Sequence, residues 1–368
     1  MPRLTKMLRG VHRATQKFAK TARKKLRNAP LEVDDGRSAA CLCRALDERG
    51  ISFERRGIPP RKFLIFSVNG REYRYTFRGA LLTADGNGIL GPLTDDVTTE
   101  LLSQKHLVNS LLRLHGFSVP EGLAFSRGSH SDACAYFSAL LPSTPAGICV
   151  KPATGKRGRK VYVGVHDLKV FRSALNAVTR AFDQALIEEV VIGTIYRFFC
   201  IAGRVVAIRY GLPANVKGDG FHSIEELLSV KNRQRAINPF VKQIKLTGPG
   251  QKLLEAEKMS LTSIPDSGEI VWLSRMSNLD QGADIVDATE AVHPSYSALV
   301  EQAVQKFPGL VLCGADVAVE DASEPASNAN HHFIELNSSP GFEAHHYPTI
   351  GAPRDVAGAI VAYLTSRL

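Results

Sequence analysis

Two short stretches of this 368-residue sequence combine charged or amide side chains with strand-like surroundings. In the first, Glu335 and Asn337 are two residues apart, and a strand places such side chains on one face. A carboxylate beside an amide oxygen suits a hard cation such as Mg²⁺. Asp316 ends a second apolar run, 310–316, and we expect it to supply another oxygen from a neighbouring strand. A solvated strand end is the alternative for a single Glu-x-Asn pair.

The second stretch is a lysine followed by a glycine-containing loop. Lys151 ends an apolar run, and the loop that follows contains Gly155, Lys156, Arg157 and Gly158. Glycines allow backbone N–H groups to approach a phosphate, and a lysine can neutralise one. This is not a Walker P-loop, because Lys156 is followed by arginine instead of serine or threonine. Taken alone, it also fits an ordinary surface loop.

A third polar cluster follows the apolar run 270–273. It contains a guanidinium, an amide and three carboxylates, on Arg275, Asn278, Asp280, Asp284 and Asp287. Such a set can line part of a substrate pocket, and a hydrated loop is the alternative.

Strand-like and helical runs alternate through residues 98–368, and these elements must hold the polar groups in place. The alternation predicts an α+β enzyme fold with a mixed sheet. The first helix of this region is expected over residues 99–114.

A separate small α/β module is predicted before that region, at residues 31–97. It contains a helix and two β-rich runs, 63–68 and 71–77. Asn69 and Gly70 separate the two runs, and this dipeptide indicates a tight hairpin because both turn positions need positive φ.

The net charge of +10 is confined to the start of the sequence. Residues 1–30 contain ten Lys or Arg and no acid, which leaves 36 basic and 36 acidic residues in the rest. A neutral body argues against a broad nucleic-acid-binding surface. For residues 1–30 we consider an amphipathic helix that contacts anionic lipid or an acidic partner, a transit peptide, and a solvated extension.

The remaining composition is that of a cytoplasmic protein. No run approaches the roughly 18 apolar residues that span a bilayer. The six cysteines are scattered, which favours reduced, buried thiols over a disulfide framework or a metal site.

An ordered series of short phrases runs through residues 98–368, about three quarters of the chain. The phrases are Gln104-Lys105, Gly116-Phe117-Ser118-Val119-Pro120, Val150-Lys151-Pro152, Ile187-Glu188-Glu189, Gly193, Tyr196-Arg197-Phe198-Phe199, Pro213-Ala214-Asn215-Val216-Lys217-Gly218-Asp219-Gly220, Cys313-Gly314-Ala315-Asp316, Glu335-Leu336-Asn337 and Pro340-Gly341. The series resembles the ATP-grasp ligases, in particular the ATP-grasp domains of cyanophycin synthetase and of bifunctional glutamate–cysteine ligase/glutathione synthetase.

The resemblance implies two α/β subdomains that clasp ATP, a nucleotide lid over about 118–192 and a larger catalytic subdomain over about 193–368. It assigns ATP binding to Lys105, Lys151, Gly155, Gly158, Glu188, Glu189 and Val190, and it implies that the backbone of residues 188–190 contacts adenine. It assigns two Mg²⁺ ions, for which Mn²⁺ can substitute, to Asp316, Glu335 and Asn337. Catalytic roles are implied for Arg275, Asn337 and Lys151. Substrate contacts are implied for Arg209, Asn215, Asn278 and His345.

The implied activity is an ATP-dependent carbon–nitrogen ligase that activates a carboxylate as an acyl phosphate and joins it to an amine. The implied substrates are amino acids or small peptides, with no nucleic acid, and the family favours a dimer. Two alternatives stay open: an ATP-binding regulatory protein without turnover, and a ligase that modifies a peptide or protein tail.

This sequence departs from its implied relatives outside the phosphate and metal positions. Ile195 stands where they have an acid suited to ribose, Gly211 where they have an arginine, and Lys160 where they have a loop glycine. Arg209, two residues before Gly211 on the same strand face, can compensate for the missing arginine. These departures favour an active ligase with a different substrate.

Overall fold

The computed structural model describes residues 37–57, 62–76, 79–84, 90–155, 159–238 and 240–367. The chain forms two compact units. The first unit comprises Met1–Asn69, Ala207–Thr289 and Gly341–Leu368, and the second comprises Gly70–Val206 and Glu290–Pro340. The two units are made of discontinuous segments, whereas the sequence predicted continuous domains with boundaries near 97 and 193. The predicted division by function stays a prediction. The extension at 1–30 and the predicted ATP-binding Gly158 lie outside the described residues.

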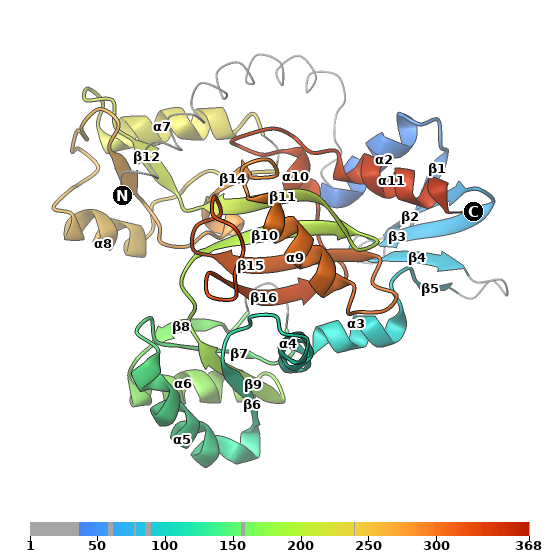
Figure 1. The fold of residues 1–368 in the computed structure, drawn as a ribbon. Coiled ribbons are helices and arrows are strands. Elements are labelled where there is room, and N and C mark those ends of the chain that lie inside the picture. The colour runs from blue at the N-terminus through green and yellow to red at the C-terminus, as the bar shows by residue number, and fades with distance from the viewer. Residues whose placement is uncertain are drawn as a thin grey trace. The chain divides into compact units, whose positions relative to one another are not determined.

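Three long antiparallel strands form the centre of the second unit (Figure 1). They are β10 (Thr194–Ile201), β15 (Leu312–Val319) and β16 (His331–Asn337), with β15 paired to both neighbours. Helix α9 (Pro294–Val304) packs against β10. Side chains such as Phe198, Val317 and Phe333 are fully buried, and the next residues Phe199 and Ala318 are buried as well, so both faces of these strands are covered here.

A four-stranded antiparallel sheet also belongs to the second unit, in the order β6–β9–β7–β8. Its strands are β6 (Gly122–Ser126), β9 (Gln184–Glu189), β7 (Ile148–Pro152) and β8 (Tyr162–Val165). Helices α5 (His130–Leu140) and α6 (Leu168–Thr179) cover one side (Figure 1). The short helices η3 (Arg127–Ser129) and η4 (Leu141–Ser143) precede and follow α5 in the chain. Phe137 of α5 stacks on Phe171 of α6 with ring centroids 4.3 Å apart, so this part has its own apolar core.

The helix predicted over 99–114 is two helices, α3 (Asp96–Ser103) and α4 (Lys105–Leu114). Gln104 separates them with φ −103° and ψ 86°, outside the helical region. The break frees the backbone N–H of Lys105, which donates to the carbonyl of Ala153 after β7 at 3.0 Å. The prediction failed because this long-range contact outweighs local helix propensity. The second unit also contains β3 (Arg71–Thr76), β4 (Leu81–Ala84) and β5 (Leu90–Pro92), paired in that order.

One part of the first unit contains a helical group and two strand pairs. Helix α2 (Arg37–Asp47) packs on α11 (Val356–Ser366) and on the short α10 (Glu343–His346). Strand β1 (Phe53–Arg56) pairs with β2 (Phe63–Val68). Strand β11 (Arg204–Leu212), which begins in the second unit, pairs from Arg209 onward with β14 (Asp284–Asp287). At Asn69 and Gly70, φ is 51° and 73°, the backbone expected of the predicted tight turn.

A smaller part of the first unit is built on β12 (Asn215–Lys217) and β13 (Ile270–Trp272), which pair antiparallel. Helix α7 (Ile224–Arg235) packs on β12, and α8 (Gly248–Ala256) packs on β13 (Figure 1). Ser223 and Glu226 form a capping box that begins α7, which explains why this helix starts there. The short helix η5 (Leu279–Gln281) precedes β14.

None of the helices in the described ranges has the length and apolar character needed to span a bilayer. All six cysteines are free thiols, and five of them are buried.

Gly193 joins β9 to β10 with a backbone that only glycine adopts easily. Its φ is 133°, and a Cβ at this position would lie 2.7 Å from the backbone oxygen of Val319 in β15. The close approach holds the start of β10 against β15, and therefore fixes the strand that carries Arg197.

We predict that Gly193→Ala lowers the free energy of unfolding by about 1–3 kcal/mol, because the new Cβ adds both backbone strain and a clash. Urea unfolding of the full chain measures this. Gly128→Ala is the matched control, since Gly128 has ordinary φ and no atom within 4 Å of the position that a Cβ would take. Equal effects of the two substitutions would contradict the assignment.

Candidate active site

Three of the predicted metal ligands lie on one face of the β15–β16 pair. Asp316 is directly opposite Glu335, and Gly314 is opposite Asn337. Directly opposed residues in an antiparallel pair point to the same side, so the two carboxylates and the amide share a face. Asp316 was expected to end its strand, but β15 continues to Val319.

An irregularity in the strand pairing lies beside these residues. Asp316 pairs with Glu335, but Val317 pairs with Phe333, so Ile334 is an extra residue in β16. This is a β-bulge, which bends a strand and redirects the side chains next to it. The bulge therefore sets the direction of Glu335 relative to Asp316.

Arg197 of β10 lies opposite Asp316 on the other side of β15 and forms a two-pronged ion pair with it. Nε donates to Oδ1 at 2.5 Å, and Nη2 donates to Oδ2 at 2.7 Å. Gly314 makes room for this guanidinium, because a Cβ there would lie 2.8 Å from Nη1 of Arg197. Burial by itself would lower the pKa of Arg197, but Asp316 raises it above its usual range.

Lys105 connects the same face to the loop after β7. Its Nζ donates to Oε1 of Glu335 at 2.7 Å and to the carbonyl of Gly155 at 2.9 Å. The side chain is held from both ends, since the backbone N–H of Lys105 is bound to Ala153. The helix break at Gln104 thus brings this ammonium group to the predicted metal ligand.

Lys151 and Glu188 form a buried ion pair between the neighbouring strands β7 and β9. Their side chains are only 7% and 4% exposed. Burial alone would lower the pKa of Lys151, but the Glu188 carboxylate raises it, so this lysine stays charged. Among the described residues, Oε2 of Glu188 has no hydrogen-bond partner. A buried acceptor of this kind fits a donor group on a ligand.

The predicted adenine-binding segment 188–190 already uses two backbone donors. The N–H of Glu189 donates to Glu121 O at 2.9 Å, and that of Val190 donates to Gly147 O at 3.0 Å. Adenine recognition by the backbone of this segment stays a prediction. The side chain of Glu188 is the feature that the sequence did not indicate.

The donor set on β15–β16 fits a magnesium-type ion. It offers two carboxylates and one amide oxygen, all hard ligands. Within the described ranges, no group of three or more His, Cys, Asp or Glu side chains is arranged to hold a metal. An ion there needs further oxygens, which water and phosphate provide in sites of this type.

The predicted substrate residues and the predicted catalytic residue Arg275 all belong to the first unit. Arg275 and Asn278 are exposed in the loop after β13, and Arg209 of β11 lies opposite Asp287. His345 is buried in α10, with 2% of its surface exposed. Their contact with substrate stays a prediction.

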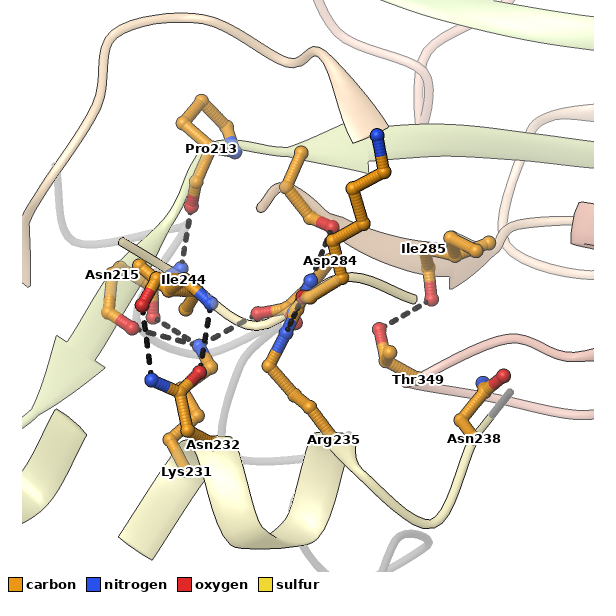
Figure 2. Close-up of polar contacts among 12 residues, drawn as sticks. Pro213, Asn215, Lys231, Asn232, Arg235, Asn238, Ile244, Asp284, Ile285 and Thr349 are labelled. Carbon is orange, nitrogen blue, oxygen red and sulfur yellow. Dashed lines mark hydrogen bonds and ion pairs between the residues drawn. The ribbon is translucent and has the colours of Figure 1, made fainter. Parts of the chain in front are cut away.

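Asn215, the fourth predicted substrate residue, is part of a buried polar network (Figure 2). Lys231 of α7 donates to the backbone and side-chain oxygens of Asn215 at 2.8 and 3.2 Å, and to Asp284 of β14 at 2.6 Å. Arg235, one turn further along α7, forms an ion pair with the other oxygen of Asp284. It also donates to the carbonyls of Lys242 and Ala283. One carboxylate thus ties α7, β12 and β14 together.

Gly211 is required by close packing inside the first unit. A Cβ at this position would lie 2.4 Å from the carbonyl oxygen of Ser277. The loop that carries Arg275 and Asn278 occupies the space where an arginine side chain at position 211 would begin. Lys160, at another departure, has φ 56°, so the backbone keeps the conformation that glycine favours.

Three residues in these contacts were not predicted as functional: Arg197, Lys231 and Arg235. Glu188 was predicted to bind ATP, but the contact of its side chain with Lys151 was not expected. Arg197 belongs to a phrase of the family resemblance, but only the register of β10 on β15 places it at Asp316. Asp284 was predicted only as one acid of a polar cluster that can line a substrate pocket. Nothing in the neighbouring sequence indicates that its side chain is buried.

We predict that Asp284→Asn lowers the free energy of unfolding by about 3–5 kcal/mol, because it leaves the buried Arg235 guanidinium without its carboxylate. Thermal and urea unfolding measure the change. Asp219→Asn is the control, since the pair of Asp219 with His222 is exposed to solvent, and its effect should be much smaller. Comparable losses in both variants would show that the network does not stabilise the unit.

Comparison with known proteins places this geometry in a family. No family model matches the chain. The chain is 29% identical over 322 residues to the cyanophycin synthetase of Trichormus variabilis, with 84% of this chain and 34% of that protein covered. It is 30% identical over 272 residues to the glutathione biosynthesis bifunctional protein GshAB of Clostridium perfringens, covering 73% and 34%.

A solved structure, the bifunctional glutathione synthetase from Pasteurella multocida, is 26% identical with a TM-score of 0.67. The match covers 90% of the present chain, which is more than the three quarters expected from the motifs. It covers 44% of the Pasteurella multocida chain. The chain spans about a third of the length of the curated relatives. These similarities confirm the resemblance seen in the sequence and the α+β fold class. The chain is a member of the ATP-grasp ligase superfamily, an enzyme related to cyanophycin synthetase and the bifunctional glutathione synthetases.

Proposed function

We propose that this enzyme is an ATP-dependent carboxylate–amine ligase that forms an amide bond through an acyl phosphate. The observation that supports this most is the shared face of Asp316, Glu335 and Asn337, with Lys105 bound to Glu335. Acidic and amide oxygens beside cationic side chains suit a metal-bound polyphosphate.

The chemical task explains why these residue types are needed. A carboxylate resists attack by an amine, because its charge repels nucleophiles and oxide is a poor leaving group. Attack of a carboxylate oxygen on the γ-phosphorus of ATP releases ADP and leaves an acyl phosphate. The amine then attacks the acyl carbon, phosphate leaves, and the nitrogen loses a proton. The protein supplies position and charge neutralisation for both steps.

In this proposal, Lys105 and Lys151 neutralise phosphate oxygens, while Asp316, Glu335 and Asn337 hold two Mg²⁺ ions. Bound Mg²⁺, or Mn²⁺ in its place, neutralises charge on the phosphate chain. The free oxygen of buried Glu188 suits a donor such as the amino group of adenine. A role for Arg275 in phosphoryl transfer is a further prediction.

The substrates we propose are amino acids or small peptides, different from those of the relatives. Two positions support a difference. Gly211 leaves no room for the arginine of the relatives, because Ser277 packs against it. Ile195 presents an exposed apolar side chain on β10. We also propose that the enzyme works in the cytoplasm as a dimer.

We expect ADP and phosphate to appear only when a carboxylate and an amine acceptor are supplied together. A phosphate-release screen of paired amino acids and short peptides tests this. Glu335→Gln should lower the rate at least about 100-fold, because it removes charge at the predicted metal site. Glu54→Gln, an exposed glutamate paired with Arg56, is the matched control and should retain full activity.

A fully active Glu335→Gln variant would rule out the proposed metal ligand. Binding of a non-hydrolysable ATP analogue with Mg²⁺, but no turnover across the panel, would favour a regulatory ATP-binding protein instead.

A further inference from the structure

We propose that Arg197 and Lys105 hold the two carboxylates of the metal site until a nucleotide replaces them, so that metal binds together with nucleotide and not ahead of it. The proposal rests on the proposed function of the face around Asp316. It assigns to Arg197 a positioning role and to the site an order of binding.

Asp316 has both oxygens occupied by one guanidinium. The Oδ1 atom accepts from Nε of Arg197, and Oδ2 accepts from Nη2. A two-pronged pair of this kind is short, directional and stronger than a single contact. A cation that approaches Asp316 therefore competes with Arg197 for the same carboxylate and meets the positive charge of the guanidinium at a distance of a few ångströms.

Glu335 is held in a comparable way by a different element. Lys105 donates to Oε1 of Glu335 and to Gly155 O. The four charged groups, Asp316, Glu335, Arg197 and Lys105, sum to zero. The face thus already has its charge balanced, and it offers a bare divalent cation little net attraction.

Burial makes the displacement of Arg197 unfavourable when no other anion is present. The side chains of Arg197 and Asp316 are only 19% and 16% exposed. A largely buried guanidinium that loses its carboxylate pays a desolvation cost that the new metal contact does not return.

A nucleotide changes this balance, because its phosphates accept hydrogen bonds from both displaced cations. Guanidinium and ammonium groups bind phosphate oxygens well. The same phosphates supply the remaining oxygen ligands that the two carboxylates and Asn337 cannot provide. Metal and nucleotide therefore each raise the affinity of the site for the other, which is a reciprocal coupling.

The test is a titration of the full chain with Mn²⁺. The electron paramagnetic resonance signal of the free ion measures how much Mn²⁺ remains unbound at each step. In the wild type, a non-hydrolysable ATP analogue should strengthen Mn²⁺ affinity at least tenfold over the nucleotide-free protein, after the Mn²⁺ that the same analogue binds in a protein-free titration has been subtracted. Arg197→Gln should strengthen nucleotide-free Mn²⁺ affinity about tenfold, since it frees Asp316 from competition. Arg197→Lys keeps the positive charge but cannot make the two-pronged contact with Asp316. Its nucleotide-free Mn²⁺ affinity should lie between those of the wild type and Arg197→Gln.

Arg204→Gln is the matched control, because Arg204 forms an ion pair with Glu301 at 2.7 Å elsewhere in the same unit. It should leave Mn²⁺ affinity unchanged, and thermal unfolding of every variant confirms that each is folded. Should Arg197→Gln fail to fold, Lys105→Gln gives a second measurement with the same expected direction.

Equal nucleotide-free Mn²⁺ affinity in the wild type, Arg197→Gln and Lys105→Gln would overturn the inference. So would tight Mn²⁺ binding by the wild type without nucleotide. The proposed function fails by a separate result, which is absence of nucleotide binding in the presence of metal.

Discussion

The pairing of Asp316 with Glu335 across β15 and β16 is the contact on which the rest of the site depends. It brings two acids from consecutive strands to one face, where like charges would repel each other. The structure stabilises them with a cation for each, Arg197 from β10 and Lys105 from α4. Gly193 and Gly314 serve the same arrangement, because one lets β10 approach β15 and the other leaves space for the guanidinium.

The first unit uses the same physical device for another purpose. Asp284 is buried and neutralised by Lys231 and Arg235, which fixes α7 against β12 and β14 (Figure 2). The ammonium group of Lys231 contacts three protein oxygens, two on Asn215 and one on Asp284. Asn215 is therefore held in place by the fold. If it contacts substrate, as the resemblance implies, it does so from a rigid position.

Much of the site follows from local pattern. The two-residue spacing of Glu335 and Asn337 indicated a shared face, and Asp316 was expected on a neighbouring strand. What the sequence could not give was long-range contact. The bulge at Ile334 depends on register, and the helix break at Gln104 depends on the bond between Lys105 and Ala153. Arg197 belonged to one of the family phrases, but the sequence assigned it no role, because its partner Asp316 is 119 residues away.

A crystal structure of the full chain with a non-hydrolysable ATP analogue and Mn²⁺ tests the central claim most directly. The account predicts an anomalous Mn²⁺ peak within about 2.0–2.3 Å of oxygens from both Asp316 and Glu335, and bonded also to phosphate oxygens. A nucleotide bound elsewhere, or a metal peak that touches neither carboxylate, would contradict it.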